Sequence, residues 1–329
     1  MRFEGFAGNE EAKQLLSSFV DGGRIPHALL IEGPTGSGRK TFARLIARAA
    51  ICTSSSEKPC GVCVPCIKSA GGNHPDIYEV ADDGKTNPYK KGFVRDLRNN
   101  AYVIPNESHR RIIILPDMQR MEENAQNVLL KILEEPPEYL IFIITCENRS
   151  QLLATVQSRI IGVSIGQVEN KVAAQIIRQI LPDTDPDDAE QAATVFGGII
   201  GQAVAGLSDG SYRNVLELAP EFALAVIKPD ELELLRLTGK LEKGKDTADG
   251  VLNSLNIIFR DALVRRAGIN EDLSYSPQAA EDLAASLTSE QLMKLMDAVE
   301  SLKRARRQYV NHTLFQTLMC SRLRTAAGR

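Results

Sequence analysis

The sequence contains no tryptophan, and aromatic residues make up only 5% of its 329 residues. Proteins that bind single-stranded nucleic acid without sequence preference stack bases on aromatic side chains. The formal net charge of -3 also argues against a globally basic nucleic-acid binder. The composition is therefore unfavourable for a dedicated nucleic-acid-binding module, although a local basic patch is compatible with it.

Long apolar runs are absent as well: none approaches the roughly 18 residues that a membrane-spanning helix needs. Residues 1–13 lack the apolar core of a secretory signal. We therefore expect a cytoplasmic protein with no membrane partner. With 43% apolar and 25% charged residues, the composition is that of an ordinary globular protein, and the length predicts two or three domains.

The hydrophobic pattern changes along the chain. Up to about residue 165, short apolar runs alternate with helical patterns, which predicts a parallel sheet covered by helices. The expected strands are residues 27–31, 76–80, 111–115 and 140–145. Beyond about residue 166 only amphipathic helical patterns follow. The longest of these, residues 289–324, is predicted to break near Asn311 and His312.

A glycine-rich segment, residues 33–38, lies between the first expected strand and a helical pattern. In a phosphate-binding loop of this form, a following Lys contacts the terminal phosphates and the next Ser or Thr binds Mg²⁺. Here these two positions are Arg39 and Lys40, and Thr41 comes one residue late. Because one residue is about 100° of rotation on a helix, Lys40 and Thr41 cannot simply take over the missing roles.

The strand that should carry the magnesium-binding acid has a second defect. It ends in Pro116-Asp117, so Asp117 is the one acidic side chain left there. Because phosphoryl transfer depends on Mg²⁺, two defects in one site make ATP hydrolysis improbable, while binding of ATP or ADP stays open. The candidate nucleotide-binding residues are Gly33, Gly36, Gly38, Arg39, Lys40, Thr41, Asp117 and Thr145.

Four cysteines, Cys52, Cys60, Cys63 and Cys66, lie within fifteen residues. In a reducing compartment such a cluster indicates a metal site and not a disulfide framework. Four thiolates can surround one tetrahedral ion at about 2.3 Å per bond. This spacing predicts a structural zinc ion, with an iron–sulfur cluster as the alternative. Such a closed site leaves no open position for catalysis.

Three further residues have side chains that can bind a metal ion: His74, Cys146 and Cys320. His74 is a possible fifth ligand, but four thiolates already close the site, so we expect it to begin the next strand. Cys146 and Cys320 are isolated in the sequence, and we interpret both as small buried apolar side chains.

Together these motifs resemble the bacterial DNA polymerase III clamp-loader subunits, which are AAA+ proteins. The glycine loop is followed by C-x7-C-x2-C-x2-C and by His74-Pro75-Asp76. Residues 127–137, NVLLKILEEPP, are similar to the NxLLKxLEEPP segment of that family. Gln157-Ser158-Arg159-Ile160 is similar to its Ser-Arg-Cys motif, with Ile160 in place of the cysteine. The similarity extends over essentially the whole chain.

The resemblance implies a three-part architecture. An AAA+ domain, a RecA-like parallel sheet with helices on both faces, would occupy residues 1–165, with a zinc-binding insertion at residues 52–66. A small helical lid would follow at residues 166–208. An all-α collar that serves oligomerisation would complete the chain at residues 209–329.

The resemblance also implies site residues. The family has ATP-hydrolysing gamma and tau members and a non-hydrolysing delta-prime type, and the departures at residues 39, 40 and 116 match the latter. Arg159, preceded by Ser158, would be an arginine finger acting in trans on a neighbouring gamma subunit's ATP, since a guanidinium stabilises the charge on a transferring phosphate. Thr145 would occupy the sensor 1 position. The sensor 2 arginine is absent, with Gly201 and Gln202 in its place.

The implied partners are the gamma/tau and delta subunits, with the sliding clamp and primed DNA reached through the complex. We expect no independent ATPase activity, but a part in the polymerase III holoenzyme. Two alternatives stay open: an ATP-hydrolysing gamma/tau-like motor subunit and a zinc-dependent nucleic-acid module. The basic run at residues 303–307 fits a solvated helix face, or a contact with an acidic neighbour or DNA.

Overall fold

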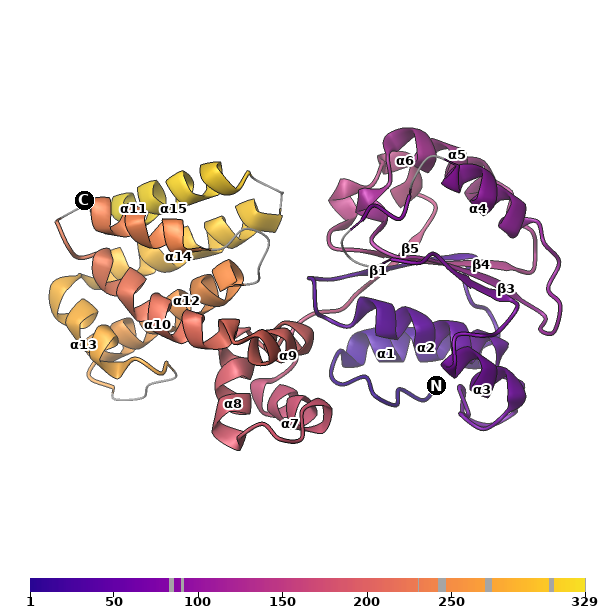
Figure 1. Ribbon diagram of the computed structural model, residues 1–329, viewed down its shortest axis with the longest axis horizontal. Helices are drawn as coiled ribbons and strands as arrows, with labels where there is room; N and C mark the ends of the chain where they lie inside the picture. The colour runs from indigo at the N-terminus through magenta and orange to yellow at the C-terminus, as the bar shows by residue number, and fades with distance from the viewer. Residues whose placement is uncertain are drawn as a thin grey trace. The chain divides into compact units, whose positions relative to one another are not determined.

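The computed structural model describes residues 1–82, 86–89, 92–229, 231–241, 247–269, 274–307 and 311–328. The chain divides into two compact units, Met1–Gln167 and Val168–Arg329 (Figure 1). The first unit contains the sheet and the second is helical. The fold class predicted from the sequence is confirmed.

The first unit is built on a five-stranded sheet with the order β2-β3-β4-β1-β5. All of its strand pairs are parallel. The central strands β3 and β4 are buried at every position, as continuous apolar runs predict for strands covered on both faces. The strands are β1 Ala28–Glu32, β2 Ile77–Glu79, β3 Arg111–Leu115, β4 Leu140–Cys146 and β5 Ile161–Ser164.

Alternation along the strands sends their side chains into two separate cores. Ile112 and Ile114 belong to the core that contains Phe42 of α2, whereas Ile113 and Leu115 belong to the core that contains Leu129 of α5. This is the two-residue period of a strand. Figure 1 shows α1, α2 and α3 on one face of the sheet, and α4, α5 and α6 on the other. The helices are α1 Glu10–Asp21, α2 Arg39–Ile51, α3 Val64–Ala70, α4 Phe93–Ala101, α5 Glu123–Glu134 and α6 Ala154–Gln157, with 3-10 turns η1 Met118–Arg120 and η2 Arg149–Gln151.

The edge strand β5 was not predicted as a strand. It has one buried side chain, that of Val163, among four residues. Its local signal is short: Ile161, Val163 and Ile165 alternate with Gly162 and Ser164, and the pairing with β1 completes the strand.

The second unit is a helical assembly around one continuous hydrophobic core, centred on Phe196, Phe222, Phe259 and Phe315. Its last two helices are separated where the sequence predicts a break, because the Asn311 side chain accepts a hydrogen bond from the Thr313 N–H at 2.9 Å and caps α15. The helices are α7 Asn170–Ile180, α8 Pro186–Val195, α9 Ile200–Asp209, α10 Ser211–Ala225, α11 Glu231–Lys240, α12 Thr247–Arg266, α13 Pro277–Ser286, α14 Ser289–Arg307 and α15 His312–Ala326.

The predicted lid and collar both lie in this second unit. Their boundary, between residues 208 and 209, falls at the end of α9, next to Gly210 with φ 77°. The buried core continues from α8 and α9 into α10 and α12. The division into lid and collar, and the outer limits of the three parts, stay predictions. Within the described parts of the chain, no helix is both long and apolar enough to span a bilayer.

The basic run at residues 303–307 is partly engaged inside the second unit. The Arg306 Nε lies 2.6 Å from Asp249 Oδ1, and its guanidinium lies over the Phe315 ring at 5.7 Å. Lys303 forms an ion pair with Glu300 at 2.8 Å. The Arg306 contacts join α14 to α12 and α15, whereas the Lys303 pair lies within α14, so at least Arg306 serves the packing of the unit.

A buried carboxylate connects β2 to the loop before β3. The Asp76 side chain is fully buried and accepts backbone hydrogen bonds from Asn106, Glu107 and Ser108 at 2.6, 2.8 and 2.7 Å. Burial tends to raise the pKa of Asp76, but these three N–H groups outweigh it and hold the pKa below its usual range. The ionised form therefore stabilises the folded state.

We expect the substitution Asp76→Asn to lower the free energy of unfolding by about 1–3 kcal/mol, since an amide NH₂ would face backbone donors. The pKa is depressed in the folded state, so this stabilisation is present above the ordinary carboxyl value of about 4 and is lost as the pH falls below it. Urea unfolding of both proteins at pH 7 and pH 3.5 tests this. Asp96→Asn, at an exposed position, is the control; equal stability of wild type and Asp76→Asn at pH 7 would contradict the prediction.

Candidate functional site

The loop after β1 has the backbone form of a phosphate-binding loop. Gly36 and Gly38 have positive φ values of 83° and 90°, and a Cβ on Gly33 would lie 2.3 Å from the carbonyl oxygen of Ile165. Gly38 then precedes α2, which begins at Arg39. The glycines are thus required by the local geometry, whether or not a ligand binds.

Three loops meet at one edge of the sheet, because the carboxyl ends of parallel strands lie together. Residues 33–38 follow β1, Asp117 follows β3, and Thr145 lies near the end of β4. The Thr145 side chain is fully buried, and its Oγ1 accepts a hydrogen bond from the Asp117 N–H at 2.8 Å. The sequence-predicted nucleotide residues are therefore brought together in space.

Arg39 occupies the centre of this edge. Its side chain is 7% exposed, donates to the Gly33 carbonyl oxygen, and places Nη2 2.5 Å from Asp117 Oδ1. In a working phosphate loop the cation contacts phosphate and the strand-end acid holds Mg²⁺. Here the two side chains bind each other, so the Arg39 guanidinium provides the positive charge that neutralises Asp117.

The ion pair extends into a charged network that the sequence did not predict. Lys40 Nζ lies 2.6 Å from Asp82 Oδ2 and 3.7 Å from Asp117 Oδ2. Arg120 Nη1 lies 2.8 Å from Asp82 Oδ1. Asp82 and Arg120 follow β2 and β3 in the chain, and acids after parallel strands are the signal that could have pointed to Asp82. Thr41 is exposed on α2.

The structure also shows where the residues at the two sensor positions implied by the family resemblance lie. Thr145 lies beside Asp117, as described. Gly201 and Gln202 lie in α9 of the second unit, and Gln202 is 4% exposed. No arginine stands at either position.

The four cysteines converge on one point. Cys52 ends α2, Cys63 precedes α3, Cys66 lies within α3, and Cys60 lies in the loop between these helices. All four Sγ atoms lie within 4.8 Å of one another, and the Cys52 and Cys63 Sγ atoms are 3.9 Å apart. Four ligands at 2.3 Å around a tetrahedral ion would be about 3.8 Å apart, so the cluster fits a metal ion.

The surroundings shift the pKa values of the clustered thiols in opposite directions. Burial tends to raise the pKa of Cys63, but backbone hydrogen bonds from Thr53 and Cys66 and bonds from neighbouring thiols outweigh it and lower the pKa to about 6. Burial is the main cause that raises the pKa of Cys66 to about 12. Neighbouring thiolates repel one another, so full ionisation of the cluster requires a bound cation.

His74 and the two isolated cysteines lie outside this cluster. His74 Nδ1 accepts a hydrogen bond from the Asp76 N–H at 3.2 Å, just before β2. Cys146 is fully buried at the end of β4, and burial raises the pKa of its thiol to about 12. Cys320 is partly buried against the core of the second unit. These placements agree with apolar roles for both cysteines.

Arg159 lies one residue beyond Ser158, which caps the short helix α6. Its Nη1 donates to the Thr155 carbonyl oxygen at 2.7 Å and to Ser158 Oγ at 3.1 Å. Its Nη2 lies 2.6 Å from Glu134 Oε1 at the end of α5. The side chain is 34% exposed. Glu134 is a further residue that the sequence did not single out as part of the site.

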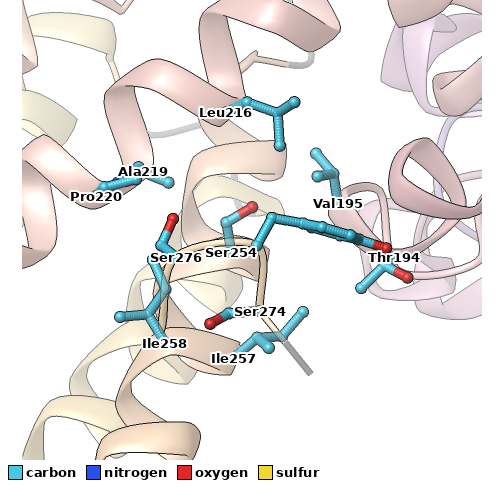
Figure 2. A pocket seen from close by; sticks show the side chains of 11 residues that line it. Thr194, Val195, Leu216, Ala219, Pro220, Ser254, Ile257, Ile258, Ser274 and Ser276 are labelled. Carbon is cyan, nitrogen blue, oxygen red and sulfur yellow. The ribbon is translucent and has the colours of Figure 1, made fainter. Parts of the chain in front are cut away.

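A small pocket in the second unit is unrelated to these sites. Figure 2 shows it between side chains of α8, α10 and α12, with Leu216, Val195, Ser254 and Ile258 among those that line it. Its volume of about 20 Å³ has room for roughly one water molecule. It is too small for a nucleotide.

Comparison with known proteins places the chain in a family. A family model described as DNA polymerase III, delta subunit, matches residues 8–169. The delta' subunit of DNA polymerase III from Bacillus subtilis is 26% identical over 295 residues, which cover 87% of this chain and 85% of that protein. The chain belongs to the family of DNA polymerase III clamp-loader subunits. This agrees with the resemblance inferred from the sequence motifs.

Gamma and tau members of the clamp-loader family are similar over shorter stretches. The gamma/tau subunit of Mycobacterium tuberculosis is 36% identical over 158 residues, which cover 48% of this chain. This chain spans only about a quarter, 27%, of the length of that relative. The tau subunit of Bacillus subtilis is 27% identical over 79% of this chain and 46% of its own length.

Solved structures were also compared. A gamma subunit-related protein of DNA polymerase III from Thermotoga maritima covers 97% of this chain, with 17% identity and a TM-score of 0.39. A RuvB variant from Thermotoga maritima covers 85% of this chain, with 14% identity and a TM-score of 0.42.

The contact between Arg39 and Asp117 should be measurable as a coupling energy. We expect Arg39→Met and Asp117→Asn each to lower the free energy of unfolding by about 1–3 kcal/mol, because each leaves a largely buried partner without its counter-charge. The double variant should cost less than the sum of the two, with a coupling of about 1 kcal/mol or more.

Urea unfolding of the four proteins in the cycle supplies the measurement. The same cycle on the exposed pair of Lys228 and Glu233, at 2.7 Å, is the control and should give a coupling below about 1 kcal/mol. Additive effects at residues 39 and 117 would show that the two groups do not depend on each other.

Proposed function

We propose that this chain is the non-hydrolysing, delta-prime type subunit of a DNA polymerase III clamp loader. The observation that carries the proposal is the ion pair between Arg39 and Asp117, at 2.5 Å. It engages the acid that would hold Mg²⁺, while Lys40 stands where a hydroxyl ligand is needed. Similarity over nearly the full length of the Bacillus subtilis delta' subunit supports the same assignment.

In this proposal the chain works as one subunit of a larger assembly. Its partners are gamma/tau-type and delta-type subunits, and it reaches the sliding clamp and primed DNA through them. The helical second unit supplies the lid and the collar. The nucleotide loop of the chain is retained as a structural element between β1 and α2, and it does not turn over ATP.

An ATP-hydrolysing gamma/tau-like subunit is the second candidate. The 36% identity to the Mycobacterium tuberculosis gamma/tau subunit, confined to 158 residues, is the observation that favours it. The site disfavours it, because Mg²⁺-dependent chemistry needs ligands that Pro116 and Lys40 do not offer. ATP turnover by the purified chain alone would decide for this candidate.

We propose that this chain contributes to ATP hydrolysis on a neighbouring subunit through Arg159. Its guanidinium is partly exposed and held by three contacts, which suits a group that must meet a phosphate on another subunit. A positioned arginine stabilises the charge on a transferring phosphate at low reorganisation cost. Ser158 supports it through the hydrogen bond from Nη1 at 3.1 Å.

We expect Arg159→Ala to abolish hydrolysis at the one ATP site that faces this subunit, since an arginine finger contributes about 10³-fold or more where it acts. Total ATP turnover of the reconstituted loader should fall by the share of that site, which steady-state and single-turnover assays with clamp and primed DNA measure. Arg149→Ala, an exposed arginine on the neighbouring turn, is the control. Unchanged hydrolysis by the Arg159→Ala loader would refute the finger.

The metal in the cysteine cluster is proposed to be zinc. Four thiolates in a closed tetrahedral arrangement are typical of structural zinc sites. The cluster joins the end of α2 to the start of α3, so the ion would hold an otherwise loop-rich segment onto the helix behind the phosphate loop. When bound, zinc would supply structural cross-links and no catalytic position.

We expect about one zinc ion per chain by elemental analysis, with no visible absorption from an iron–sulfur cluster. Cys63→Ala should lose most of the metal and lower the melting temperature, because folding of the segment and metal binding are coupled. Cys320→Ala, outside the cluster, should keep both values. Equal zinc content in wild type and Cys63→Ala would exclude the assigned site.

A further inference from the structure

We propose that Glu134 is the positioning residue for Arg159: it holds the guanidinium so that a bidentate donor edge faces the phosphate of a neighbouring subunit. This inference rests on the proposed function of Arg159. Glu134 is the last residue of α5, and its Oε1 lies 2.6 Å from Arg159 Nη2.

The contacts of Arg159 are distributed unevenly over its guanidinium. Nη1 donates to the Thr155 carbonyl oxygen and to Ser158 Oγ, and Nη2 forms an ion pair with Glu134. A guanidinium has five N–H donors in a rigid fork. Nε and Nη2 are neighbours in that fork, so one N–H of each can bind two phosphate oxygens together.

The two segments that carry this pair, the end of α5 and the residues after α6, are fixed to each other. Val156 and Ile160 flank Arg159 in sequence, and both are buried in the core that also contains Leu133, the neighbour of Glu134. The Leu153 N–H donates to Gln126 Oε1 of α5 at 3.1 Å. The separation between Glu134 and the backbone of Arg159 is therefore set by a packed core and not by surface loops.

Charge also favours this position of the guanidinium. The C-terminal end of a helix carries partial negative charge, and Glu134 adds a full one at the end of α5. The Thr155 carbonyl, near the end of α6, likewise accepts from a cation. Both attractions draw Arg159 to one place. The Glu134 side chain is about half exposed, so its attraction is moderate and does not prevent the arginine from binding a phosphate as well.

The physical consequence is preorganisation. An arginine without these contacts samples many rotamers, and its ordering would have to occur in the transition state. Three contacts in the resting protein remove most of that freedom beforehand. Loss of Glu134 should therefore lower the turnover number and leave the KM for ATP nearly unchanged.

The experiment uses the reconstituted clamp loader with its gamma/tau-type and delta-type subunits, clamp and primed DNA. Glu134→Ala should lower the finger-dependent kcat by about threefold to tenfold. Glu134→Gln should recover part of the loss, because its amide oxygen keeps the position and part of the negative charge of Oε1 beside Nη2. Glu135→Gln, an exposed neighbour on the same chain segment, is the matched control and should behave as wild type.

A second cycle separates positioning from a general structural role. In the Arg159→Ala background, Glu134→Ala should have no further effect on kcat, since the two act through one group. A structural role would lower kcat in both backgrounds and would also lower the melting temperature of the isolated chain. An unchanged or raised kcat in Glu134→Ala alone would overturn the proposal, the raised value meaning that the carboxylate holds Arg159 back.

The outcomes also distinguish this inference from the function on which it rests. If Arg159→Ala leaves hydrolysis unchanged, the arginine finger itself is wrong. If Arg159→Ala abolishes hydrolysis at one site and Glu134→Ala matches wild type, the finger stands and the positioning role fails.

Discussion

The parallel arrangement of the sheet is the constraint on which the first unit depends. Parallel strands must be joined by crossover segments, so helices cover both faces and every strand begins at the same edge. The alternating side chains of β3 and β4 then fill two separate cores. The loops at the carboxyl ends are freed from packing and collect at one edge. Gly33, Asp117 and Thr145 meet there because of this topology, although they are far apart in the sequence.

At that edge the chain forms an internal charge network. Arg39 and Lys40 face Asp117 and Asp82, and Arg120 completes the group. Such groups are costly to bury alone and are tolerated because each carboxylate has a cation within hydrogen-bonding distance. The ion pairs of Arg39 and Lys40 thus stabilise the connection between β1 and α2. This physical reason links the sequence departures at residues 39 and 40 to the proposed non-hydrolysing role.

The cysteine cluster and the Arg159 segment do not belong to this charge network, and each is built from different interactions. The cysteine cluster lies in the segment between α2 and α3, where the short helix α3 and its loop offer few buried apolar side chains of their own. The Arg159 segment is instead held by the buried side chains of Val156 and Ile160 and by the ion pair between Arg159 and Glu134. The cysteine cluster brings together four thiols that fit a metal ion, whereas the Arg159 segment depends on packing and charge.

Much of this could be predicted from the sequence. Continuous apolar runs identified β1, β3 and β4, and the spacing of four cysteines was sufficient to predict a metal site, because these signals are local. The edge strand β5, with one buried side chain, has only a short alternation of apolar residues around Val163. The contacts of Asp82, Arg120 and Glu134 could not be read from the chain either, since each joins charges that are at least 25 residues apart. The sequence by itself determined which residues were missing from the nucleotide loop. The tertiary structure alone decided where Arg39 points and what holds Arg159, because an ion pair depends on distances that only the packed sheet and helices establish.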